Sequence, residues 1–69
     1  MKIKVYEITK KEADNIVKNF QKDVQKEFPY SINEQGNNIE LTINSKCALD
    51  NMIYEEFIFH GYTTEHLRG

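Results

Sequence analysis

Thr9 to Phe28, TKKEADNIVKNFQKDVQKEF, is the stretch that decides the fold. Apolar side chains recur in it at helical spacing, and charged or amide side chains fill the positions between them. Thr9 is followed three residues later by Glu12, which is the signature of a capping box at the start of a helix. Pro29 ends the pattern because proline cannot continue a helix. The stretch predicts an amphipathic helix whose buried face consists of Ala13, Ile16, Val17, Phe20, Val24 and Phe28.

Alternating apolar and polar side chains predict strands on both sides of this helix. The first residues, MKIKVY, alternate in this way and predict a strand over residues 2–8. The same alternation occurs over residues 30–33 and 39–43. The connection between these two segments, residues 34–38, contains Gly and Asn, which tolerate the positive φ of a tight turn. We therefore expect a β-hairpin.

The most apolar part of the chain is residues 47–59, CALDNMIYEEFIF, with nine apolar side chains in thirteen. We interpret it as a second helix over residues 46–60. Ser45 can cap the start of this helix, and Gly61 fits the left-handed position that follows a helix end. Tyr62 would then fold back onto the last turn in a Schellman-type contact.

Two elements near the C-terminus have alternative interpretations. Residues 52–59 could instead form a strand, because their aromatic content favours a sheet. The tail, TTEHLRG at residues 63–69, could add a short helical turn capped by Thr63 or Thr64.

Together these elements predict one α+β domain over residues 1–69, in the order β-α-β-β-α. We expect a three-stranded mixed sheet with both helices packed on one face. A right-handed crossover through the first helix would make the first two strands parallel and the third antiparallel to both. The order of the strands across the sheet stays open.

Size, charge and cysteine content restrict the classes of protein that fit. The chain has 69 residues, a net charge of −2 and a single cysteine, Cys47, so neither an internal disulfide nor a CxxC site is expected. The basic excess of a general nucleic-acid binder is absent. No apolar signal segment or membrane span is recognisable. With one free thiol and no Asn-x-Ser/Thr sequon, we expect a cytoplasmic protein. The Lys-, Asn- and Ile-rich composition favours a bacterial or phage origin.

Few residues in the chain indicate chemistry. Glu56 and His60 are four residues apart and can approach each other on a helix, but two ligands do not make a metal site. A histidine in the last turn also interacts favourably with the helix dipole. Cys47 has no base placed beside it by the sequence, and a lone cysteine is usually a small apolar side chain. We therefore expect no enzyme, cofactor or metal.

The surplus of apolar residues in the second helix indicates a second buried surface. Leu49, Met52, Ile53 and Phe57 are expected to cover the sheet, which leaves Cys47, Tyr54 and Ile58 on the other side. With Glu55 on their polar rim, these three resemble an interface core. Three coverings fit this stripe: the C-terminal tail through Tyr62 and Leu67, a second copy of the chain in a homodimer, or another protein.

The leading functional hypothesis is a small non-enzymatic protein-binding module that modulates or inhibits a larger partner, with Cys47, Tyr54, Glu55 and Ile58 as the binding residues. The alternative is a nucleic-acid-binding regulator that uses the lysine row of the first helix, Lys11, Lys18 and Lys22, with Tyr6 or Tyr30 as stacking surfaces. Acidic residues interspersed with these lysines favour an ordinary solvated face instead.

Overall fold

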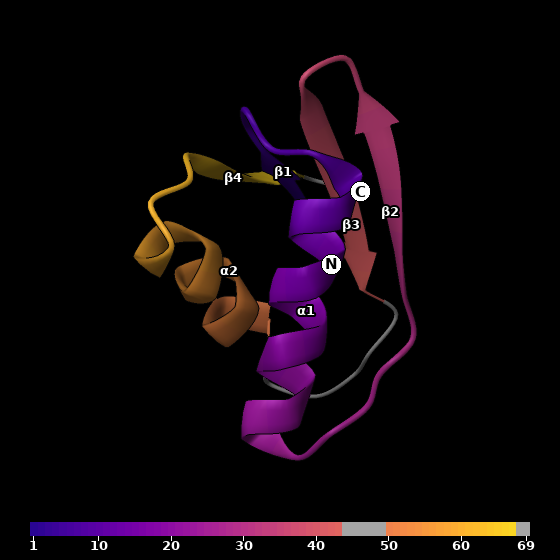
Figure 1. Cartoon of the computed structure of the whole chain (residues 1–69), viewed down its shortest axis with the longest axis vertical. Helices are drawn as coiled ribbons and strands as arrows, with labels where there is room; N and C mark the ends of the chain where they lie inside the picture. Colours follow the sequence, from indigo (N-terminus) through magenta and orange to yellow (C-terminus); the bar gives the residue numbers. More distant parts are fainter. Residues whose placement is uncertain (44–49, 68–69) are drawn as a thin grey trace.

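The computed structural model describes residues 1–43 and 50–67 of the chain (Figure 1). Two helices lie together in front of a sheet of four strands. Along the chain, the elements are β1 (Lys2–Val5), α1 (Lys10–Val24), β2 (Tyr30–Gln35), β3 (Asn38–Ile43), α2 (Asp50–Phe59) and β4 (Thr64–Leu67). The prediction of an α+β chain is confirmed. None of the described helices is long and apolar enough to cross a membrane.

The sheet has the strand order β2-β3-β1-β4, and every pair of neighbours is antiparallel. The prediction of a three-stranded mixed sheet is therefore wrong. Strands β1 and β2 do run in the same direction, but β3 lies between them, so they form no parallel pair. The resulting β-α-β-β-α-β order is that of the ferredoxin-like motif, which hosts many unrelated functions and selects none of them.

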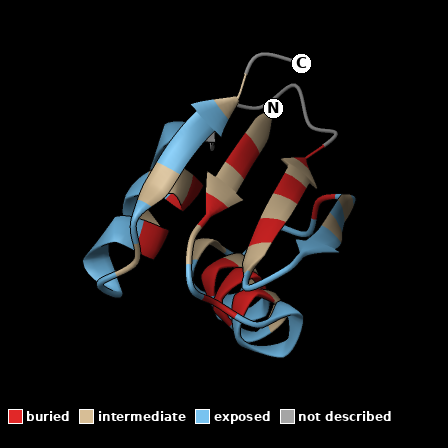
Figure 2. Ribbon diagram, turned by 90° about the horizontal axis from the view of Figure 1, so that it is seen from above, coloured by how far each residue is buried: buried red, intermediate tan, exposed pale blue. Residues whose placement is uncertain are grey.

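The tail is the fourth strand and not a helical turn. Strand β4 pairs with β1 from Val5↔Thr64 to Lys2↔Leu67. Without this strand the backbone groups on that side of β1 would have no partners in the sheet, and unpaired backbone groups are costly to bury. Figure 2 shows the consequence: β1 and β3 carry alternating buried residues in the middle of the sheet, whereas β2 and β4 form its more exposed edges.

The core lies between the inner face of the sheet and the two helices. It contains the inward side chains of both central strands, one face of α1 and two side chains of α2. Its buried members are Ile3, Val5, Ile8, Ala13, Ile16, Val17, Phe20, Phe28, Ile39, Leu41, Ile43, Ile53 and Phe57. All six apolar residues of the predicted α1 face pack in or against this core, with Val24 only partly buried.

Helix α1 begins as predicted and ends earlier than predicted. The Thr9 hydroxyl accepts the Glu12 N–H, and the Glu12 carboxylate accepts the Thr9 N–H, so the capping box is confirmed. The helix does not continue to Phe28. Gln25 adopts the left-handed conformation, with φ of 54°, and its N–H donates to the Lys22 carbonyl. Phe28 still reaches the core, because the chain turns back and places its ring edge-on against Phe20.

Strand β1 is shorter than the predicted segment of residues 2–8. It ends at Val5, and Glu7 has a positive φ of 54°, which is incompatible with a continuing strand. The Glu7 N–H donates to the Asn38 side chain, and the Ile8 N–H donates to the Asn37 carbonyl. This bend carries the chain from the sheet into α1 and buries Ile8.

The predicted hairpin is confirmed, with a tighter turn than the predicted connection over residues 34–38. Strand β2 continues to Gln35 and β3 begins at Asn38, so only Gly36 and Asn37 connect them. Gly36 has φ of 65°, a conformation that glycine adopts without steric cost.

The second helix is confirmed for residues 50–59, and the alternative strand over residues 52–59 is wrong. Its predicted first residues and the Ser45 cap lie outside the described part of the chain. At its end, the Gly61 N–H donates to the Ile58 carbonyl at 2.9 Å and the Tyr62 N–H donates to the Phe57 carbonyl at 3.1 Å. These two bonds, with Gly61 at φ of 90°, form the predicted Schellman motif.

Candidate functional site

The large apolar side chains that remain exposed in the described residues all lie on α2. Met52 and Ile58 are each 47 % exposed, and Phe59 is 87 % exposed. Ile53 and Phe57 of the same helix are fully buried. Scattered exposed apolar residues are normal in soluble proteins, but these three lie within a single helix of ten residues.

Helical spacing gathers these side chains on one side of α2. Met52 and Phe59 are seven residues apart and therefore lie on one line along the helix. Glu55 is three residues from Met52, three from Ile58 and four from Phe59, so it is a neighbour of all three. Glu56 flanks the line on its other side. We call this group, Met52, Glu55, Glu56, Ile58 and Phe59, the α2 surface.

A shallow depression connects the α2 surface to α1. It has a volume of about 260 Å³ and is lined by Phe20 of α1 together with Met52, Glu55, Glu56 and Phe59 of α2. Pockets for drug-sized ligands usually measure about 300–1,000 Å³ and enclose their ligand. The size and the apolar floor of this depression are better suited to a side chain than to a cofactor.

The sequence identified this helix but placed its faces inaccurately. Met52 was expected in the core, and it lies on the exposed side. Tyr54 was expected on the second apolar stripe, for which the C-terminal tail was one of three possible coverings; it is half-buried, packs against the core and is covered by that tail. The cause is β4: the Tyr54 ring stacks on His66, and its hydroxyl donates to the Thr64 carbonyl at 3.2 Å. Because β4 contacts Tyr54, the side of α2 that bears Tyr54 is buried.

The four predicted protein-binding residues have different positions. Glu55 and Ile58 are exposed on the α2 surface, whereas Tyr54 faces β4. Cys47 lies outside the described residues. Met52 and Phe59 are surface residues that were not predicted, although their spacing of seven in the sequence places them on one helical line.

Glu56 and His60 approach each other as their spacing indicated. The His60 Nε2 atom lies 3.4 Å from the Glu56 Oε1 atom, and both side chains are partly exposed. Within residues 1–43 and 50–67, no three His, Cys, Asp or Glu side chains are arranged to hold a metal ion. The pair can restrain the last turn of α2 next to the exposed Phe59.

The lysine row of α1 is partly engaged within the molecule. Lys18 pairs with Asp14 at 2.9 Å, and the Tyr30 hydroxyl donates to the other oxygen of the same carboxylate. Lys11 and Lys22 are exposed. The Tyr30 ring packs edge-on against Phe28 and lines a surface depression with Lys10 and Lys18.

The outer face of the sheet is polar. Side chains on the two central strands alternate, and those opposite the core are Lys2 and Lys4 on β1 and Asn38, Glu40 and Thr42 on β3. Lys2 lies 3.6 Å from Glu40, and the Lys4 ammonium lies over the Tyr6 ring at 5.1 Å from its centroid. Four-stranded RNA-binding sheets stack bases on aromatic side chains of such a face. Here the outward positions of β1 and β3 carry none.

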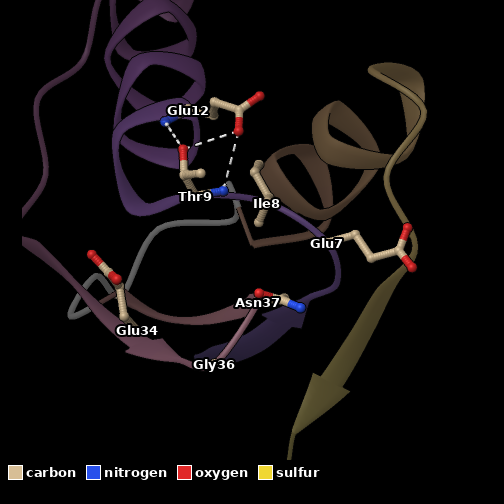
Figure 3. A pocket seen from close by; sticks show the side chains of 7 residues that line it. All are labelled: Glu7, Ile8, Thr9, Glu12, Glu34, Gly36 and Asn37. Atoms are coloured by element: carbon tan, nitrogen blue, oxygen red, sulfur yellow. Dashed lines mark hydrogen bonds between the residues drawn. The ribbon is translucent and has the colours of Figure 1, made fainter.

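A second depression, of about 400 Å³, lies beside the start of α1 (Figure 3). Three carboxylates line it, but they do not converge. Glu12 is held by Thr9 in the capping box, and the Glu7 side chain extends away from Glu34. The bonds from Thr9, and a further bond from the Tyr62 hydroxyl, lower the pKa of Glu12. The Glu12 carboxylate therefore stabilises the first turn of α1 as part of the capping box.

Comparisons with protein-family models, with curated proteins and with solved structures found no match.

Proposed function

We propose that the protein is a small non-enzymatic binding module that docks on a larger protein through the α2 surface and modulates or inhibits it. The observation that carries this proposal is the exposure of Phe59, 87 % of which faces solvent beside Met52 on the same helical line. Burying a large apolar side chain contributes about 1.5–3 kcal/mol. Two or three such side chains therefore offer a partner a substantial gain.

The α2 surface also has the composition of a binding site. Met52, Ile58 and Phe59 surround Glu55, and Glu56 lies at their edge; well-defined interfaces combine an apolar core with a polar rim. Aromatic side chains and methionine are enriched in such cores. The depression beside Phe59 can accept one anchoring side chain from the partner, which is the usual form of an energetic hot spot.

The rest of the described surface supports other functions less well. The outer face of the sheet is polar and lacks aromatic residues on β1 and β3, and Lys18 of the lysine row is paired with Asp14. A reducing cytoplasm suits the proposed module, because the chain has one cysteine and gains nothing from an oxidising compartment.

Site-specific photo-crosslinking tests the proposal. A photoreactive phenylalanine analogue is placed at position 59, and at position 33 on the exposed outer side of β2 as a control, in cells of the organism that encodes the chain. We expect a protein adduct at position 59 that is absent at position 33. The partner is then purified, and its affinity is measured for the wild type, Phe59→Asp and the matched control Asn33→Asp.

Phe59→Asp should weaken binding by at least about tenfold, whereas Asn33→Asp should leave it unchanged. Circular dichroism establishes that both variants remain folded. An absence of adducts at position 59, or equal affinity of the wild type and Phe59→Asp, would overturn the proposal.

A further inference from the structure

The position of Glu55 restricts the chemistry of any protein that covers the α2 surface. This exposed carboxylate is a helical neighbour of Met52, Ile58 and Phe59, so it lies among the apolar side chains and not at their edge. Among the described residues, no lysine or arginine pairs with it. A partner that buries Phe59 and Met52 must therefore also remove water from Glu55.

Burying a carboxylate without a partner is strongly unfavourable. We propose that the α2 surface docks a segment of another protein in which an arginine or lysine, set among large apolar side chains, pairs with Glu55. This inference rests on the proposed function and specifies the chemistry of the partner. Arginine suits the position well, because its planar guanidinium binds a carboxylate through two hydrogen bonds and packs on apolar surfaces.

The surroundings of the depression add to the negative charge. Glu56 lines the depression with Glu55, and the exposed Asp23 follows Phe20 by three residues on α1. Helix α2 itself contains no lysine or arginine. An apolar side chain of the partner would thus enter a depression with acidic groups on its sides. These groups attract cations that lie on either side of that apolar side chain.

Within residues 1–43 and 50–67, a second copy of the chain does not supply this chemistry. Its exposed large apolar side chains, within the described residues, are those of α2 itself. A symmetric dimer through these side chains would bring Glu55 and Glu56 of one copy toward Glu55 and Glu56 of the other, and like charges in an interface are unfavourable. The lysine row of α1 offers cations but no exposed large apolar side chain beside them.

Selection from a displayed library of random peptides tests this inference even while the partner is unidentified. The wild-type protein is the bait, and peptides that also bind Phe59→Asp are discarded. We expect the remaining peptides to be enriched in arginine or lysine next to large apolar residues. Affinities of purified peptides are then measured for the wild type, Glu55→Gln, Glu55→Arg and the control Glu65→Gln, which changes an exposed carboxylate on β4.

Glu55→Gln should weaken binding by about tenfold, Glu55→Arg should weaken it further, and Glu65→Gln should have no effect. Replacing the selected arginine or lysine by glutamate should restore binding to Glu55→Arg. Peptides without cations, or equal affinities of the wild type and Glu55→Gln, would overturn the inference while leaving the proposed function intact. A selection that yields no peptide dependent on Phe59 counts against both.

Sedimentation equilibrium tests the choice between another protein and a second copy. We expect the wild type to remain monomeric up to its highest soluble concentration at low salt. A dimer that dissociates in Phe59→Asp would show that the α2 surface is covered by a second copy, and the inference of a basic partner would then be wrong.

Discussion

The ring of Tyr54 on α2 lies stacked on the imidazole of His66 on β4, with 4.1 Å between the ring centroids and 18° between the ring planes. This contact joins the second helix to the edge strand of the sheet. It also accounts for the orientation of α2, because the side of the helix that bears Tyr54 faces the strand and the side that bears Phe59 faces solvent.

Loss of this stack should destabilise the protein measurably. Aromatic pairs contribute about 0.5–1.5 kcal/mol beyond the area they bury, so His66→Ala should lower the free energy of unfolding by that amount. Glu65→Ala, at the neighbouring outward position of β4, is the control and should cost less. Urea unfolding of His66→Ala, Tyr54→Leu and the double variant measures the coupling between the rings. A coupling of zero would show that the stack contributes nothing.

The same substitution at two phenylalanines of α2 should change stability by very different amounts. Phe57 is fully buried, and Phe57→Ala should cost about 3–5 kcal/mol. A core of this size rarely supplies more than about that amount, so the variant should be largely unfolded. Phe59→Ala should change stability by less than about 0.5 kcal/mol.

Circular dichroism with urea titration compares the two variants, and Ile53→Val, expected to cost about 0.5–1.5 kcal/mol, gives a core change mild enough to measure. Equal destabilisation by Phe57→Ala and Phe59→Ala would mean that Phe59 is packed in solution.

The hydrogen bond between Tyr30 and Asp14 should make stability depend on pH at both ends of the scale. The bond from Tyr30, with a second from Lys18, lowers the pKa of Asp14. Its ionised form therefore stabilises the fold above the unfolded pKa, and this stabilisation is lost as the pH falls through the lower folded value. Asp14→Asn should cost on the order of 1 kcal/mol at neutral pH and less in acid, as measured by urea unfolding at each pH.

The pKa of Tyr30 shifts in the opposite direction, so its contribution to stability has the opposite dependence on pH. Burial, followed by the bond to Asp14, raises its pKa to about 12. The protonated phenol thus stabilises the fold below the unfolded pKa of about 10, and the stabilisation disappears as the pH rises through about 12. Ultraviolet titration should show one phenol ionising near that pH, and Tyr30→Phe should remove this step. A titration unchanged in Tyr30→Phe would contradict the assignment.

The two left-handed helix ends predict a stabilising and a destabilising substitution. No heavy atom lies within 4 Å of the position that a Cβ would take at Gly61, so Gly61→Ala should cost about 1 kcal/mol through its φ of 90° alone. Gln25 occupies the equivalent conformation after α1, with φ of 54°. Gln25→Gly should relieve that strain and raise stability by a few tenths to about 1 kcal/mol. Thermal unfolding measures both, and a less stable Gln25→Gly would contradict this account.

Local sequence signals predicted most elements of the fold. The capping box at Thr9, the Gly-containing hairpin and the left-handed Gly61 each depend on residues close together in the chain, and each is confirmed. The fourth strand was missed because TEHL alternates too weakly to indicate a strand. Its backbone partners lie on β1, more than fifty residues earlier, and no local pattern reports such pairing.

The same missing strand explains why the candidate surface was only partly predicted. Periodicity identified two apolar sides of the second helix and placed Glu55 and Ile58 on the exposed one. It could not determine which side of the helix each neighbour would cover. Strand β4 covers the side of α2 that bears Tyr54, and therefore Met52 and Phe59 face solvent.

Helix α2 contributes Ile53 and Phe57 to the core and exposes Phe59 from the same ten residues. A protein that binds the exposed side of α2 would therefore also stabilise the core, because binding to the folded form alone shifts the unfolding equilibrium. Unbound copies would unfold more often and be degraded first. Under the proposed function, the cellular amount of this small protein would then follow the supply of its partner.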